Sequence, residues 1–290
     1  MNAPLALELV PPAPSPVVSL REIFGDLHCR PDITHWAYHA DRSCVSASGL
    51  KQLLRSPAHF QTYLNEEHKE TPALMLGTAI HARLLEPELF METYVTTAIA
   101  DKRSNEYRMF ELNNADKQIL SFDQFIAVEG IARSVEKHEM ANHLLSIGAV
   151  EHTIIWQDEE TGIWCKIRPD CLNADIDLGV CVDVKSTEDA SEEAFIRSCI
   201  KYQYDLQAAF YLEGLRSAFG RDFDFCFLPV EKSAPYGCQL FAAPAEMLER
   251  GQRLVRKALR TLKRCRDTGE WPCYQPDGGF SLMRWPRNLN

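Results

Sequence analysis

The spacing of apolar positions predicts helices in the first half of the chain. The stretch "SASGLKQLLRSPAHFQTYL" begins with Ser46, a residue type that caps helices, and places Leu50, Leu53 and Leu54 at helical spacing. Pro57 interrupts this pattern, so a second short helix should follow it. We therefore expect two short helices here.

Two more helical stretches complete this half. "LMLGTAIHARLLEPELF" keeps a helical pattern until about Glu86, where Pro87 should end it. A longer helical pattern runs from about Ala115 to Leu145. The first half is thus predicted to be mainly α.

The period then changes to that of strands. "VEHTIIWQ", the turn-like "DEETG" and "IWCKIRPD" predict a β-hairpin, and "LGVCVDVKST" predicts a third strand. One long helix is expected over "SEEAFIRSCIKYQYDLQAAFYLEGLRSAFG", strands over "DFDFCFLPVEK" and "YGCQLFAA", and a last helix over "AEMLERGQRLVRKALRTLKRCRD". This order predicts an α/β or α+β fold, in which helices flank a mixed central sheet.

The N-terminal sequence suggests a tail ahead of one domain. Residues 1 to about 20 carry five prolines and cannot form a regular helix or a central strand. We extend this mobile tail to residue 40 and assign 41–290 to a single domain. Its parts are a mainly helical segment (41–145), the sheet core (146–245) and a basic C-terminal helix and tail (246–290).

Composition excludes several classes of protein. Hydrophobic residues make up 46% and charged residues 25% of the 290 residues, as in ordinary soluble proteins. No apolar run approaches the roughly 20 residues that span a bilayer, and the N-terminus lacks the basic region of a signal peptide. We expect a cytoplasmic protein with no membrane partner. Its ten cysteines include no Cys-x-x-Cys pair, which argues against zinc ribbons and iron–sulfur motifs.

The third predicted strand carries unusual charges. Side chains alternate along a strand, so Val180, Val182 and Val184 point one way, whereas Asp183 and Lys185 point the other, with Cα atoms about 6.7 Å apart. Burying an ion pair for stability alone is usually no better than apolar packing. A carboxylate acting through a divalent metal, beside an ammonium that stabilises an attacking hydroxide, suits phosphate chemistry.

Such a metal needs further ligands. Magnesium takes one or two carboxylates, and the upstream candidates are Glu151 and Asp170 at the ends of the hairpin strands. Taken alone, Glu151 also fits a solvated strand end and Asp170, after Pro169, a turn. The order of the acids resembles the PD-(D/E)xK nuclease superfamily, with "RPD" giving the first aspartate and "DVK" the D-x-K.

A closer resemblance rests on five blocks in order. "SASGLKQLLRSPAHFQTYL", "GTAIHARLLEPELF", "EHTIIWQDEETGIWCKIRPD", "CVDVKST" and "YDLQAAFY" resemble the exodeoxyribonuclease VIII (RecE-type) branch, which is related to RecB nuclease and lambda-type exonucleases. The similarity covers roughly Val45 to Val230. A D-x-K alone is a weak signal, whereas five blocks in order are specific.

The resemblance implies roles for single residues. The ligands of Mg²⁺, or of Mn²⁺ in its place, would be His81, Asp170, Asp183 and the backbone carbonyl of Val184. Glu151 would be a water-mediated ligand or belong to a second metal position. Without the resemblance, His81 between apolar neighbours would fit an ordinary core histidine.

Three other residues would act on the substrate. By resemblance, Lys185 would orient and activate the attacking water, and Gln207 and Tyr211 would position the DNA strand or its phosphate. Their spacing of four puts Gln207 and Tyr211 on one helix face. Without the resemblance, these two residues would be interpreted as ordinary surface and core positions of a helix.

The overall charge does not favour DNA binding. A net charge of −10 and a pI near 5.4 are unusual for a protein that neutralises phosphates. The last helix nevertheless carries a basic stripe, which we define as Arg253, Arg256, Lys257, Arg260, Lys263 and Arg264. We assign Arg256, Arg260 and Lys263 to phosphate binding, with a solvated helix face as the alternative.

The resemblance thus predicts a Mg²⁺-dependent exodeoxyribonuclease that degrades linear double-stranded DNA. It further implies 5′-to-3′ digestion that leaves 3′ tails for recombination, a ring-shaped homotetramer and a single-strand annealing recombinase as partner. The alternatives are another nuclease of the superfamily, such as an endonuclease or a Cas4-like enzyme, and a non-catalytic DNA-binding module on the same fold.

Overall fold

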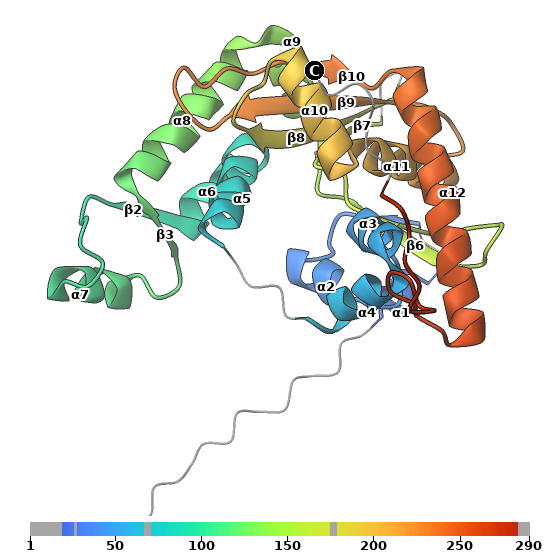
Figure 1. Cartoon of the computed structure of the whole chain (residues 1–290). Coiled ribbons are helices and arrows are strands. Elements are labelled where there is room, and N and C mark those ends of the chain that lie inside the picture. The colour runs from blue at the N-terminus through green and yellow to red at the C-terminus, as the bar shows by residue number, and fades with distance from the viewer. Residues whose placement is uncertain (1–18, 26–27, 67–70, 175–178, 284–290) are drawn as a thin grey trace, which may run out of the picture.

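The computed structural model describes residues 19–25, 28–66, 71–174 and 179–283, and its centre is a mixed sheet (Figure 1). Five strands lie in the order β10-β9-β8-β7-β4. Their bounds are β4 Ala149–Val150, β7 Cys171–Asn173, β8 Gly179–Thr187, β9 Phe223–Glu231 and β10 Phe241–Ala242. Among the described strands of this sheet only β8 and β9 run parallel, and helices flank the sheet, so the predicted fold class is confirmed.

Strand β8 separates two apolar clusters, as its alternation predicts. Val182 and Val184 pack among residues of α5 (Pro72–Leu85), α8 (Phe122–Lys137) and α9 (Glu139–Ile147). Cys181 packs on the opposite side with α3 (Ala47–Arg55), α11 (Tyr204–Phe219) and α12 (Ala245–Thr268). Asp183 shares the face of Cys181 and is 1% exposed, so its charge is held in the interior.

The predicted hairpin forms, but in a second sheet. β5 (Thr153–Gln157) pairs with β6 (Trp164–Ile167) and with the short β1 (Cys29–Arg30). The chain crosses from the central sheet to this one between β4 and β5 and returns between β6 and β7. Glu151, whose φ is 55°, and Asp170 lie in these two crossings. The first predicted strand therefore divides into β4 and β5, whereas the second forms only β6, and β7 begins just beyond it.

The first two helices of the N-terminal half that the sequence predicted begin at the expected residues. Ser46 accepts a hydrogen bond from the Gly49 N–H and begins α3, and Pro57 begins α4 (Pro57–Asn65). The helix predicted up to Glu86 is α5, and Pro87 begins α6 (Pro87–Thr93).

The predicted helix over 115–145 is wrong at its start. β3 (Gln118–Ser121) pairs in parallel with β2 (Tyr94–Thr97), and α7 (Asn105–Asn113) precedes it. A capping box between Ser121 and Gln124 begins α8 only at 122, and α8 ends before α9.

The single helix expected after β8 is also divided. Gln203 takes a left-handed conformation with φ 53°, which separates α10 (Glu192–Tyr202) from α11. Neither glycine nor proline marks this break, so residue types gave no signal for it. The final helix α12 forms as expected and buries Ala258, Leu259 and Leu262.

The predicted tail of residues 1–40 is too long. Residues 1–18 lie outside the described residues, but α1 (Leu20–Phe24) and α2 (His35–Ala40) are folded and Leu20 is fully buried. The Lys166 ammonium donates to the carbonyls of Tyr38 at 2.6 Å and Asp41 at 2.8 Å, which fixes the end of α2 on β6. Within the described part of the chain, no helix is both long and apolar enough to span a membrane.

Candidate metal centre

Three residues from separate elements bring metal-ligand atoms together. His81 comes from α5, Glu151 from the β4–β5 crossing and Asp170 from the β6–β7 crossing. One ligand atom from each lies within 4.8 Å of the others. We call these residues the donor triad. The sequence predicted all three as metal residues, and the fold places them side by side.

The backbone of β8 completes one side of the triad. Asp170 Oδ2 accepts a hydrogen bond from the Val184 N–H at 2.7 Å and lies 3.5 Å from His81 Nδ1. Since the N–H and C=O of one strand residue point to the same edge, the Val184 carbonyl faces this side too. Burial and the nearby Lys185 lower the pKa of His81, which favours the neutral ring that can bind a metal.

Asp183 lies beside the triad and not within it. Its carboxylate forms an ion pair with Lys185 and accepts a hydrogen bond from Gln207 Nε2 at 2.8 Å. Burial by itself lowers the pKa of Lys185, but Asp183 and Asp170 outweigh it and hold the pKa above its ordinary value. The shared face predicted for Asp183 and Lys185 is confirmed as a direct contact, whereas the metal role of Asp183 stays a prediction.

Arg168 orients Glu151 and was missed by the sequence analysis. Its guanidinium pairs with the Glu151 carboxylate and donates to the Ile33 carbonyl at 2.7 Å and to Thr153 Oγ1 at 3.1 Å. Burial and the neighbouring Asp170 raise the pKa of Glu151. The only sequence signal was the position of Arg168 two residues before Asp170 in "RPD".

The triad opens into a polar cavity of about 240 Å³. Gln207 and Tyr211 line it, as their spacing on α11 suggested, and Tyr211 Oη donates to the Arg168 carbonyl at 3.4 Å. One wall comes from α2, whose His35 and His39 rings lie 4.3 Å apart between centroids. This wall belongs to the segment that the sequence analysis had assigned to a tail.

Lys51 of α3 was also missed. Its Nζ donates to Gln207 Oε1 at 3.2 Å, so Gln207 bridges Lys51 and Asp183. Burial, and secondly the charge of Lys185, lower the pKa of Lys51 to about 8. The helical pattern around Lys51 indicated only a helix and gave no reason to single it out.

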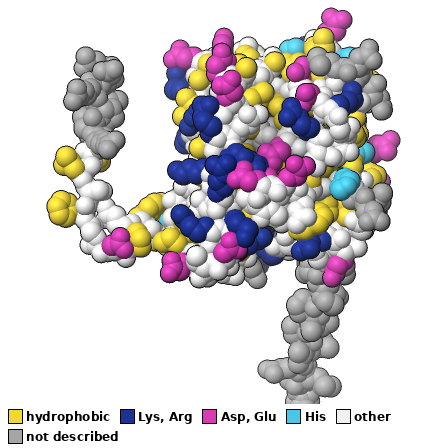
Figure 2. All heavy atoms as spheres, turned by 90° about the vertical axis from the view of Figure 1, so that its right-hand side faces the viewer, with side chains coloured by type: hydrophobic (Ala, Val, Ile, Leu, Met, Phe, Trp, Pro, Cys, Tyr) yellow, Lys and Arg dark blue, Asp and Glu magenta, His cyan; other side chains and the backbone are white. Residues whose placement is uncertain are grey.

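The basic stripe lies apart from this cavity and is largely paired with acids. Arg256 donates to Asp158 Oδ1 at 2.6 Å, and Arg260 to Glu160 Oε1 at 2.5 Å. Lys263 bonds Asp267 one turn along α12. Figure 2, which faces α12, shows basic and acidic side chains next to one another. That Arg256, Arg260 and Lys263 bind DNA stays a prediction, and their pairing weakens it.

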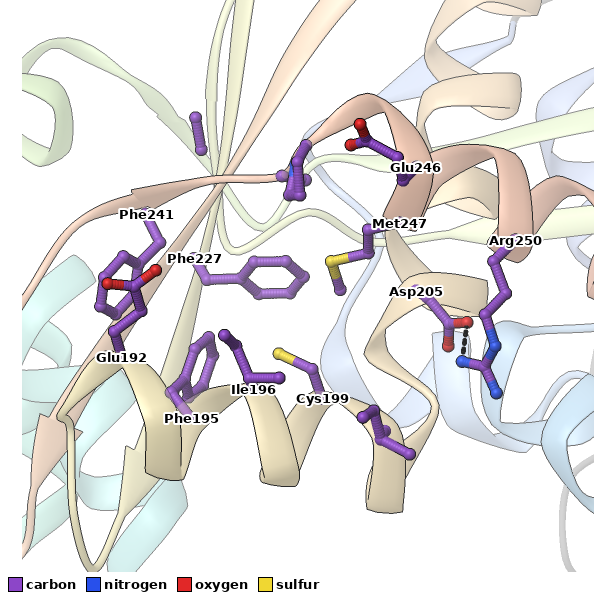
Figure 3. Close-up of a pocket in the computed structure, with 14 residues that line it drawn as sticks. Glu192, Phe195, Ile196, Cys199, Asp205, Phe227, Phe241, Glu246, Met247 and Arg250 are labelled. Carbon is purple, nitrogen blue, oxygen red and sulfur yellow. Dashed lines mark hydrogen bonds and ion pairs between the residues drawn. The ribbon is translucent and has the colours of Figure 1, made fainter.

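A separate groove of about 540 Å³ is apolar (Figure 3). Phe195 and Ile196 of α10 face Phe227 and Met247 across it, and a paired Asp205 and Arg250 lie at one end. None of these side chains belongs to the donor triad. The chemistry therefore belongs to the smaller polar cavity.

The donor triad gives a pH-dependent prediction. Burial, and secondly repulsion by Asp183, raise the pKa of Asp170 to about 7. Because the folded pKa exceeds the unfolded one, the folded state binds more protons between about pH 4 and 7, and its free energy of unfolding falls as pH rises. Asp170→Asn should remove this loss and raise the melting temperature at about pH 8 in EDTA by about 2 °C or more.

Thermal melts in EDTA at two pH values, followed by the same melts with Mg²⁺, measure this effect. Mg²⁺ should stabilise the wild-type protein and have little effect on Asp170→Asn. A variant that is destabilised in EDTA at both pH values would contradict the electrostatic account of Asp170.

Comparison with known families matches most of the chain. The model of a PDDEXK-like domain of unknown function, DUF3799, matches residues 46–277. No curated protein matches the chain. The matched range contains the donor triad together with Asp183, Lys185 and Gln207.

Solved structures support the fold. A crystal structure from Eubacterium rectale titled "Putative exonuclease" superposes with a TM-score of 0.58 at 15% identity, covering 88% of this chain and 95% of that one. The structure of SSO0001 gives a TM-score of 0.30 at 11% identity over 74% and 84% of the two chains, which is too low to carry an argument. At such identities, the first structure is evidence for the fold alone.

Proposed function

Because this chain belongs to the family of PDDEXK-like domains DUF3799, we propose that it is a Mg²⁺-dependent exodeoxyribonuclease of the RecE type. The observation that carries the proposal is the donor triad, which lines a polar cavity, together with the buried Asp183–Lys185 pair that Gln207 connects to this cavity. A structural role for this arrangement is a poor explanation, because buried ion pairs rarely stabilise a fold better than apolar packing does.

The donor set fits a hard divalent cation. Two carboxylates, a neutral imidazole and a nearby backbone carbonyl suit Mg²⁺ or Mn²⁺. The donor triad contains no cysteine. Arg168 bonds Oε2 of Glu151 and Val184 bonds Oδ2 of Asp170, so each carboxylate keeps a second oxygen for a ligand. His81, Glu151, Asp170 and the Val184 carbonyl would hold the ion, with Asp183 beside them.

In hydrolysis, individual residues of the chain would have separate roles. A bound cation supplies charge neutralisation at the phosphate and a water that ionises more readily. The Lys185 ammonium, kept protonated by Asp183, would stabilise negative charge as it develops on the attacking oxygen and the phosphate. Gln207, which contacts both Asp183 and Lys51, would orient the phosphate, and Arg168 would keep Glu151 turned toward the site.

The finer features rest on resemblance. The five sequence blocks support 5′-to-3′ digestion of linear duplex DNA to 3′ tails, a homotetrameric ring and an annealing recombinase as partner. The likeness to the structure titled "Putative exonuclease" supports the fold, and the preference for an exonuclease over an endonuclease rests on the five sequence blocks. An iron–sulfur enzyme of the Cas4 type is less well supported, because among the described residues no group of neighbouring metal-donor side chains includes a cysteine.

The dependence on a DNA end tests the proposal. With Mg²⁺, the protein should release nucleotides from a linear duplex and leave the covalently closed circular form of the same DNA intact. Linearising the circle with a restriction enzyme should restore digestion. Efficient cutting of the closed circle would instead favour the endonuclease, and no cutting of either form in Mg²⁺ or Mn²⁺ would favour the non-catalytic module.

A further inference from the structure

Three cations beside the cavity form no ion pair with a described residue, unlike Arg253, Arg256, Arg260 and Lys263 of the basic stripe. Lys51, Arg55 and Lys201 border a shallow depression of about 310 Å³ that contains no acidic side chain. Arg55 Nε donates to Tyr274 Oη at 3.3 Å, and Lys201 Nζ lies 5.0 Å from the centroid of the Tyr202 ring. Among the described residues, none of the three cations forms an ion pair with a carboxylate. In a chain with a net charge of −10, this is a local excess of positive charge.

Lys51 connects this depression to the candidate metal centre. Its ammonium bonds Gln207, which in turn bonds Asp183. Lys51 Nζ lies 5.3 Å and Lys185 Nζ 4.9 Å from the centroid of the same Tyr204 ring. Asp183 pairs directly with Lys185, whereas Lys51 makes no ion-pair contact with any described carboxylate and feels Asp183 and Asp205 only from a greater distance. A half-buried ammonium that no carboxylate contacts is costly, and a bound anion would offset this cost.

The exposed aromatic ring of Tyr202 borders the same depression. Tyr202 is 49% exposed and stacks on Tyr204 with centroids 5.7 Å apart. The left-handed Gln203 ends α10 here, so Tyr202 and Lys201 lie next to the start of α11, which carries Gln207. Cations without ion pairs beside a half-exposed aromatic ring are the combination that binds single-stranded nucleic acids, through phosphates and base stacking respectively.

We propose that this depression binds a single DNA strand where it meets the cavity, with Lys51, Arg55 and Lys201 on its phosphates and Tyr202 against a base. We call these four residues the strand patch. The proposal rests on the proposed nuclease function and names the form of DNA held next to the metal centre. It also places the phosphate contacts on α3 and α10 and not on the stripe of α12.

The test measures binding without chemistry. The full chain in EDTA is titrated into a fluorescein-labelled oligothymidylate, and anisotropy is followed at several KCl concentrations. Arg55→Gln with Lys201→Gln should weaken binding about tenfold and reduce the slope of log K against log salt by about 1.4, since each lost single-strand phosphate contact removes about 0.7. Tyr202→Ala should weaken binding at least about fivefold and leave the slope unchanged.

The matched control removes two exposed charges from the basic stripe. Arg253→Gln with Lys257→Gln should keep both the affinity and the salt slope of the wild type. Wild-type affinity and slope in the Arg55/Lys201 variant, equal losses in both double variants, or no binding by the wild-type protein would each overturn the proposal. Thermal melts confirm that each variant is folded.

The nuclease assay separates this proposal from the proposed function. If the wild-type protein binds the oligonucleotide through the strand patch but degrades no DNA in Mg²⁺ or Mn²⁺, the nuclease proposal fails and the patch stands. If the protein degrades linear DNA while the patch variants bind as the wild type does, the patch is wrong and the nuclease proposal stands.

Discussion

Asp183→Asn should abolish DNA hydrolysis and leave the fold intact. The amide has the shape of the carboxylate and can still meet Gln207, but it removes the negative charge that is paired with Lys185 and available to a cation. Loss of one preorganised electrostatic group at a reacting centre costs about 10² to 10³ in rate, and loss of a metal-site charge should cost at least as much. The measurement is release of acid-soluble nucleotides from linear duplex DNA in Mg²⁺.

Asp158→Asn is the matched control for this variant. Asp158 is also a buried aspartate, 4% exposed, paired with a cation, Arg256, but away from the cavity. Its replacement should lower the melting temperature and leave nucleotide release near the wild-type rate. Near-normal turnover by Asp183→Asn would contradict the assigned site, whatever its effect on stability.

Lys185→Met should separate chemistry from metal binding. The ammonium faces Asp183 and Asp170, so its removal deletes the cation that would stabilise the developing negative charge but leaves the donor triad in place. We expect kcat to fall at least about 10²-fold. Affinity for Mn²⁺, measured by calorimetry, should stay the same or increase because a competing positive charge is gone.

Lys185→Arg provides the comparison. It keeps the charge opposite Asp183, so the melting temperature should recover relative to Lys185→Met, whereas turnover should recover only in part because the guanidinium differs in shape. Loss of Mn²⁺ binding in folded Lys185→Met would contradict the role given to Lys185. It would then be a residue that holds the triad in shape.

The faces of strand β8 and the starts of two helices could be predicted, because they follow from the local sequence pattern. The alternation in "GVCVDVKST" put Asp183 and Lys185 on one face of β8, and the capping residue Ser46 and the proline Pro57 marked the starts of α3 and α4. The positions of Glu151 and Asp170 near this strand came from family resemblance. Local pattern alone left both as ordinary strand-end residues.

What the sequence could not predict depended on residues distant along the chain. The acids that pair with Arg256 and Arg260 lie on the hairpin turn and on α11, so the charge spacing of α12 could not reveal that the stripe is largely paired. Lys51 becomes notable only because Gln207, 156 residues later, is its partner. The wall that α2 contributes to the cavity depends in the same way on Lys166, which fixes α2 from a later strand.

The two crossings between the sheets carry a thermodynamic consequence. The chain passes between the hairpin sheet and the central sheet through Glu151 in one direction and near Asp170 in the other. A cation held by both carboxylates would fasten the sheets at the two points where the chain joins them. Detachment of the hairpin and loss of the ion would then be one event, so the free energy of detaching the hairpin would rise with the concentration of the cation.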